Sequence, residues 1–218
     1  MAKTIRTAGT GSLSLKPDLI RLEMTISGTR REYDETMLLS AEQSSALCGC
    51  FRSIGFDEKA VKTSSFNISS EYENRRDDEG NYKRVFVGYG FRQELHVEFD
   101  ADNALLGRVL TAISGCSAVP EFRIEYTVRD RETARLELLD RAVADSKLKA
   151  ERLAKAAGMR GILVAQNIVS DGDVPDMSVR PLGGMMLAKC ANECAAPDIT
   201  PEDVKISDTV SVVWQIVD

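Results

Sequence analysis

The sequence contains a single histidine, His96, and this scarcity restricts the chemistry that the chain can support. A nucleophilic centre of the Ser-His-Asp or Cys-His type needs a histidine as its base, so His96 is the one candidate. On the strand predicted around it, Arg92, Glu94 and Glu98 share its face, which is typical of a solvated or interfacial surface. We therefore predict no catalytic residue.

The chain also lacks the ligand clusters and glycine-rich loops that bind metals and nucleotides. A tetrahedral zinc site needs several soft ligands, and His96 has no second ligand near it in the sequence. Gly9-Thr10-Gly11 has no third glycine and precedes a strand, so it predicts a turn and not a phosphate loop. Five cysteines are expected to be free thiols, namely Cys48, Cys50, Cys116, Cys190 and Cys194. We predict neither a metal nor a cofactor.

Long hydrophobic runs are missing as well. No segment approaches the roughly 18 apolar residues of a membrane-spanning helix, so no membrane insertion is expected. The first residues include Lys3 and Arg6 without the apolar segment of a secretory leader, which predicts a cytoplasmic protein. A net charge of -6 disfavours binding to nucleic acid. The balance of 43% hydrophobic and 28% charged residues is that of an ordinary globular chain.

What the chain does contain is a clear succession of strand and helix patterns in its middle. Apolar residues recur at every second position in the strands and at three-to-four-residue spacing in the helices. The predicted elements are strand 85–99, helix 102–114, strand 122–128, helix 131–157 and strand 162–169. This β-α-β-α-β order predicts a small inserted α/β module over residues 84–169.

The two ends of the chain predict a second module. Ile20, Leu22, Met24 and Ile26 alternate with polar residues as in an amphipathic strand, and a helical pattern follows over residues 33–54. Residues 61–72 predict a strand and residues 73–83 an exposed hairpin loop. The last strand, over residues 204–217, is too apolar to stand alone. We therefore predict an α+β fold with a terminal module formed by residues 1–83 and 170–218.

One long segment, from Asp171 to Pro201, has no periodicity and holds four of the six prolines. A loop of this length indicates a functional, flexible or oligomer-contacting segment. Met185, Met186 and Leu187 form an apolar run within it. The favoured interpretation is a loop tucked over the core, and the alternative is an adaptable contact for another subunit or a ligand. Trp214 is expected in the core, with a ligand contact as the alternative.

Several short motifs carry a family resemblance when taken in order. They are Gly9 and Gly11 before Lys16-Pro17-Asp18, Gly55 through Lys62-Thr63, Phe66, Tyr72, Gly88-Tyr89, and the segment Ala142, Asp145, Ser146, Lys149, Ala150, Leu153, Ala154, Gly158, Gly161. Together they resemble the SIMPL-domain family of bacterial proteins. The resemblance implies a two-module α+β fold with a ferredoxin-like plait as its central module, and a tendency to form homo-oligomers. It implies no catalytic residue. Many members are periplasmic and linked to envelope and oxidative-stress responses.

Three functional hypotheses follow. The favoured one is a non-enzymatic SIMPL-domain protein that self-associates into a homo-oligomer and acts as a scaffold or partner-binding protein, with the link to stress implied by the resemblance. The second is a small-ligand binding module that uses a cleft between the two modules, lined by Met185, Met186 and Trp214. A hydrolase that uses His96 or the cysteines is the least favoured.

Overall fold

The computed structural model describes residues 3–76, 82–170, 175–180 and 200–217. The chain divides into two compact units. The terminal unit comprises Met1–Asp18, Thr127–Val179 and Pro201–Asp218, and the central unit comprises Leu19–Tyr126 and Arg180–Thr200. Buried apolar clusters lie within each unit.

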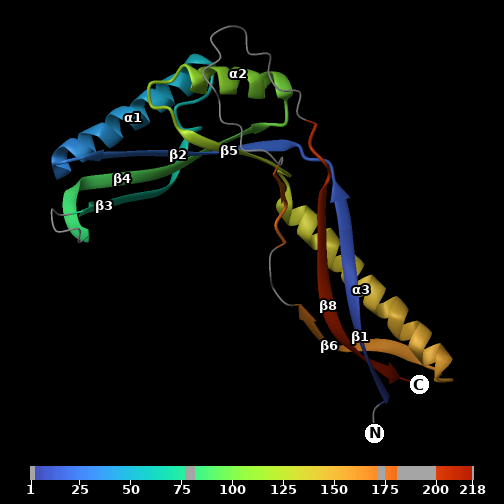
Figure 1. Cartoon of the computed structure of the whole chain (residues 1–218). Helices are drawn as coiled ribbons and strands as arrows, with labels where there is room; N and C mark the ends of the chain where they lie inside the picture. The colour runs from blue at the N-terminus through green and yellow to red at the C-terminus, as the bar shows by residue number, and fades with distance from the viewer. Residues whose placement is uncertain (1–2, 77–81, 171–174, 181–199, 218) are drawn as a thin grey trace. The chain divides into compact units, whose positions relative to one another are not determined.

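The terminal unit is an antiparallel sheet of three strands with one long helix packed on it (Figure 1). Its elements are β1 (Lys3–Leu15), α3 (Arg131–Ala156), β6 (Ile162–Ser170), the two-residue β7 (Ser178–Val179) and β8 (Val204–Val217). The sheet order is β1-β8-β6, and β1 pairs with β8 along its whole length. The apolar final strand thus finds its hydrogen-bonding neighbour at the other end of the chain.

Two glycines of β1 allow α3 to approach the sheet closely. A Cβ atom added to Gly9 would overlap the carbonyl oxygen of Ala142, and one added to Gly11 would overlap the carbonyl oxygen of Leu138. The Gly9-Thr10-Gly11 segment therefore lies inside a strand, and the predicted turn is wrong. These glycines serve close packing, because only a residue without a side chain leaves room for the helix backbone.

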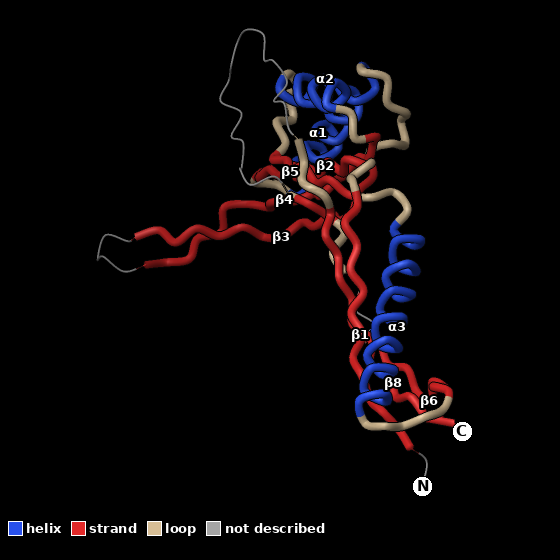
Figure 2. Tube along the Cα trace, turned by 90° about the vertical axis from the view of Figure 1, so that its right-hand side faces the viewer, coloured by secondary structure: helices blue, strands red, loops and turns tan. Residues whose placement is uncertain are grey.

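The central unit has the element order β-α-β-β-α-β. Its elements are β2 (Leu19–Arg30), α1 (Tyr33–Ser53), β3 (Lys62–Arg76), β4 (Tyr82–Asp100), α2 (Asn103–Ser114) and β5 (Glu121–Thr127). The strands lie in the order β3-β4-β2-β5, with β4 antiparallel to both β2 and β3. Both helices lie on one side of this sheet (Figures 1 and 2). This connectivity is that of a ferredoxin-like module.

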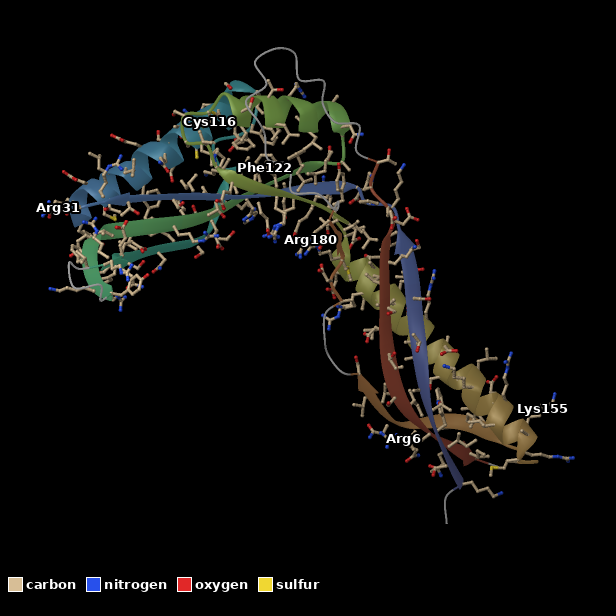
Figure 3. All side chains as sticks on the ribbon, viewed as in Figure 1. Arg6, Arg31, Cys116, Phe122, Lys155 and Arg180 are labelled. Carbon is tan, nitrogen blue, oxygen red and sulfur yellow. The ribbon has the colours of Figure 1, made fainter. Side chains whose placement is uncertain are left out.

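Alternation along the strands builds the core of the central unit. Ile20, Leu22, Met24 and Ile26 are buried, as their spacing in the sequence predicts. Partners from β4 and the helices complete the cluster, including Phe91, Leu95, Val97, Phe99, Leu47, Phe51, Leu106, Val109 and Ile113. Cys116 belongs to the same cluster, on the helix-covered side of the sheet (Figure 3). The opposite face of the sheet is polar.

The α+β class is confirmed, but the structure divides the chain at other positions than the sequence predicts. The ferredoxin-like module spans residues 19–126 and has the order β-α-β-β-α-β, instead of a β-α-β-α-β module over residues 84–169. The reason is long-range pairing, because β4 takes both β2 and β3 as its neighbours. Helix α3 and strand β6 instead join β1 and β8. Among the helices of the described ranges, none is long and apolar enough to cross a membrane.

Candidate functional site: the exposed edge of β6

Strand β6 lies at the edge of the terminal sheet and exposes apolar side chains. It pairs with β8 on one side, and it has no strand partner among the described residues on the other. The exposed fraction is 73% for Ile162, 45% for Val164, 51% for Ile168 and 48% for Val169. An edge that offers unpaired backbone groups together with apolar side chains is a template for pairing with another strand.

The sequence of β6 lacks the residues that usually protect such an edge. From Ile162 to Ser170 it contains no lysine, arginine, aspartate, glutamate or proline. One protective device is present, a bulge between Ala165 and Asn167 that leaves Gln166 without a partner in the β8 register. The amide of Gln166 donates instead to the side-chain oxygen of Gln215 on β8. The segments on both sides of the bulge keep their regular register.

The exposure of β6 has a structural cause. Helix α3 packs mainly against β1 and β8, and it reaches β6 only marginally. Leu163 alone among the β6 side chains packs against the buried cluster around Trp214. Most of β6 is thus fixed by its hydrogen bonds to β8, and helix α3 does not cover its side chains.

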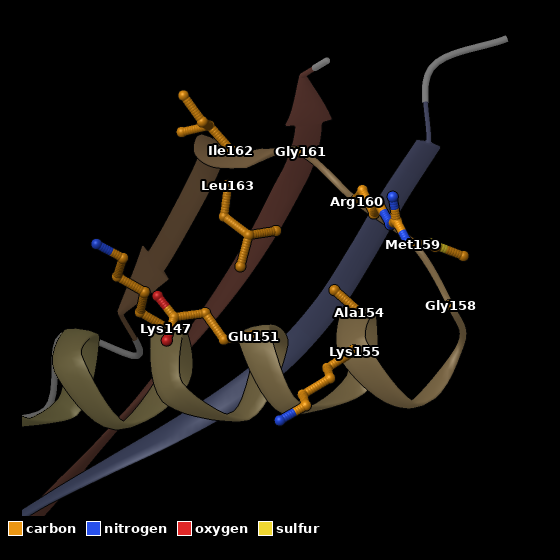
Figure 4. Close-up of a pocket in the computed structure, with 10 residues that line it drawn as sticks. All are labelled: Lys147, Glu151, Ala154, Lys155, Gly158, Met159, Arg160, Gly161, Ile162 and Leu163. Carbon is orange, nitrogen blue, oxygen red and sulfur yellow. The ribbon is translucent and has the colours of Figure 1, made fainter.

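A cleft of about 570 Å³ lies where α3 ends and β6 begins (Figure 4). Its lining residues are Lys147, Glu151, Ala154, Lys155, Gly158, Met159, Arg160, Gly161, Ile162 and Leu163. The side chain of Leu163 points toward α3, whereas that of Ile162 points away from the helix (Figure 4). Three cationic side chains and one carboxylate line this cleft. Ligand pockets are usually lined mainly by apolar side chains, so we interpret the cleft as a charged surface next to the apolar edge of β6.

A second group of exposed and half-buried aromatic side chains lies on the central unit, but its members contact one another. Tyr33, Tyr89, Phe86 and Tyr72 form a row of edge-to-face pairs with ring centroids 5.4 to 5.6 Å apart. The guanidinium of Arg84 lies 4.3 Å from the centre of the Tyr72 ring. These rings already supply each other with favourable contacts. The β6 side chains have no comparable row, so we take the β6 edge as the candidate functional site.

Of the residues that the sequence singled out as a possible contact, the structure describes Trp214 alone. Met185, Met186 and Leu187 lie outside the described residues. Trp214 is buried in the terminal unit, and its indole Nε1 donates hydrogen bonds of 3.1 Å to Thr7 Oγ1 and 3.0 Å to Ser146 Oγ. Trp214 is therefore a core residue, as its favoured interpretation predicts.

The three described cysteines belong to the central unit. Cys48, Cys50 and Cys116 are free, and Cys190 and Cys194 lie outside the described residues. Burial and the hydrogen-bonded thiol of Cys116 raise the pKa of Cys50 to about 11. Over the part of the chain that the structure describes, no group of three or more His, Cys, Asp or Glu side chains is placed to hold a metal ion.

Comparison with known proteins identifies the family. The model of the SIMPL family, described as a protein of unknown function (DUF541), matches residues 5–214. The match covers nearly the whole chain and confirms the resemblance inferred from the short motifs. No curated protein matches this chain.

Proposed function

Since the chain belongs to the SIMPL (DUF541) family, whose function is unknown, we propose that it is a self-associating protein and that the β6 edge forms its subunit contact. In this role it acts as a scaffold or a partner-binding protein. The observation that carries the proposal is the uncharged, apolar and unpaired outer edge of β6 in the described structure.

The sequence of β6 is compatible with pairing to its own copy. An antiparallel pair of two β6 edges, related by a two-fold axis, brings the exposed apolar side chains of one copy, such as Val164 and Ile168, beside those of the other. Each contact then occurs twice, as two-fold symmetry requires. Cross-strand pairs of branched apolar residues stabilise a sheet by roughly 0.2 to 1 kcal/mol each.

The charge of β6 itself does not oppose this contact. The chain carries a net charge of -6, so two copies repel each other overall. The β6 edge brings no ionisable side chain into the contact, and its new backbone hydrogen bonds satisfy groups that otherwise bond to water. Pairing at this edge therefore places no two like charges of β6 side by side.

Sedimentation velocity on the full chain tests the proposal. Wild type is expected to sediment as an oligomer at micromolar concentration. The double substitution Val164→Lys and Ile168→Lys is expected to shift it to monomer, because each interface then gains four positive charges. Leu136→Lys is a matched control, since Leu136 is similarly exposed but lies on α3. A monomeric wild type, or an oligomer that survives the β6 double substitution, would contradict the proposal.

A further inference from the structure

A second site lies on the polar, helix-free face of the central sheet. A groove of about 440 Å³ crosses this face. Its lining residues are Arg21, Glu23, Met24, Thr25, Ser64, Arg92, Glu94, Leu95, Glu121, Phe122 and Arg123. The groove belongs to the central unit alone and is distinct from the β6 edge.

A hydroxyl and an imidazole meet beside this groove. Ser64 Oγ lies 2.7 Å from His96 Nδ1, within hydrogen-bonding distance. Ser64 is the extra residue of a β-bulge, because Thr63 pairs with Leu95 while Ser65 pairs with Glu94. Bulges often sit next to active sites, since the displaced residue can aim its side chain outside the regular ladder.

The surroundings of His96 keep its imidazole neutral near pH 7. Partial burial, Arg21 on β2 and Lys62 on β3 lower its pKa below 6.5, against the opposing effects of Glu98 on β4 and Glu23 on β2. A neutral imidazole that carries its proton on Nε2 has a free lone pair on Nδ1. His96 can then accept the proton of the Ser64 hydroxyl, which is what a general base must do.

Two arginines, Arg21 and Arg92, line the groove together with Ser64. Arg21 lies 3.5 Å from Glu98 and 3.7 Å from Glu23, but its buried Nε has no hydrogen-bond partner within the described residues. Arg92 lines the same groove and donates to Glu94 Oε1 at 3.4 Å. Cationic donors beside a nucleophile stabilise the negative charge of a tetrahedral intermediate.

We propose that Ser64 is a nucleophile, that His96 is its general base, and that this pair hydrolyses small carboxylic esters. Ser64 Oγ attacks the ester carbonyl carbon while its proton passes to His96 Nδ1. The tetrahedral intermediate collapses, the C–O bond to the alcohol breaks, and the departing alkoxide takes the proton from His96. Water then adds to the acyl-serine with His96 again as base, and the carboxylic acid leaves as Ser64 recovers its proton.

Hydrolysis of p-nitrophenyl acetate by the full chain tests the pair. Ser64→Ala and His96→Gln are each expected to lower the rate by about 100-fold, the order of magnitude of general-base catalysis. Ser65→Ala is the matched control and is expected to keep the wild-type rate, because Ser65 neighbours the pair without joining it. Mass spectrometry is expected to find a transient acetyl group on the peptide that contains Ser64. Thermal unfolding checks that each variant is folded.

The pH profile separates this mechanism from nonspecific acylation of lysines. Hydrolysis is expected to rise with pH through the lowered pKa of His96 and to be level at pH 7. A wild-type rate no higher than buffer, a Ser64→Ala rate within twofold of wild type, or a rate that still rises through pH 8 would each overturn the proposal. The β6 variants are expected to hydrolyse the ester normally, so this test is independent of self-association.

Discussion

The indole nitrogen of Trp214 on β8 donates a hydrogen bond of 3.0 Å to Ser146 Oγ on α3. A second bond of 3.1 Å reaches Thr7 Oγ1 on β1, and the Thr7 hydroxyl donates in turn to the Ser146 carbonyl oxygen at 3.0 Å. All three residues are buried. One polar cluster thus joins the first strand, the long helix and the last strand of the terminal unit.

Trp214→Phe should destabilise this unit. Phenylalanine keeps most of the apolar contact but removes the N–H that donates to both hydroxyls, and buried polar groups that lose a partner cost about 1 to 3 kcal/mol. We expect the free energy of unfolding in urea to fall by about that amount. A double-mutant cycle with Ser146→Ala checks the cause. If the two changes were simply additive, the hydrogen bond would not be the reason.

Gly9→Ala and Gly11→Ala are expected to disrupt the packing of α3 on β1. Their added methyl groups would overlap backbone atoms of Ala142 and Leu138, and backbone cannot move aside as a flexible side chain can. Overpacking of this kind costs typically about 1 to 3 kcal/mol or more. Gly49→Ala in α1 is the matched control. Its added methyl meets nothing within 4 Å, so the change should stabilise by about 0.5 to 1 kcal/mol. Thermal unfolding measures the three variants, and we expect a lower melting temperature than wild type for Gly9→Ala and Gly11→Ala but not for Gly49→Ala.

The raised pKa of Cys50 leads us to expect that the protein loses stability at alkaline pH. Its folded pKa is raised from the ordinary 9.0 to about 11 by burial and by Cys116, so folding favours the neutral thiol. The unfolded chain releases this proton first, and stability must fall as pH rises between about 9 and 11. Urea unfolding at pH 8 and pH 10 should show a smaller alkaline loss for Cys50→Ala than for wild type. Equal losses in the two proteins would show that another group is responsible.

Local patterns in the sequence predict most of the individual elements. The alternation at Ile20 to Ile26 places one face of β2 in the core, and the helical spacing predicts α2 and α3 close to their observed bounds. The grouping of these elements is not local. Whether β4 pairs with β2 and β3, or packs with α3 and β6, depends on contacts between distant residues that periodicity does not encode.

The candidate sites were harder to predict for a similar reason. The uncharged run of β6 is visible in the sequence, but its place at an edge requires the strand order β1-β8-β6. Ser64 and His96 meet because β3 and β4 pair across a bulge, and nothing local predicts that bulge. The sequence therefore leaves a chemical role for His96 as the least favoured hypothesis. A cytoplasmic location, a link to stress and a ligand cleft stay predictions.

Asp145 on α3 provides the last prediction, which concerns acid pH. Its Oδ2 accepts hydrogen bonds from Lys149 Nζ at 2.6 Å and from the Thr10 backbone N–H at 2.8 Å, and Lys149 also donates to the Ala8 carbonyl oxygen. Lys149 and the Thr10 N–H lower the pKa of Asp145 below its ordinary 3.8. The ionised carboxylate therefore stabilises the contact between α3 and β1 above pH 3.8, and this contribution disappears as pH falls through the lowered folded pKa.

Asp145→Asn should therefore be less stable than wild type at pH 7, and the difference should shrink as the pH falls below 3.8. Asparagine keeps the shape of the side chain but loses the charge that Lys149 faces. Asp140→Asn is the matched control, because Asp140 is an exposed aspartate on the same helix. Urea unfolding from pH 7 to pH 3 measures both variants. A difference between Asp145→Asn and wild type that stayed constant over this range would show that the carboxylate charge is not what holds α3 to β1.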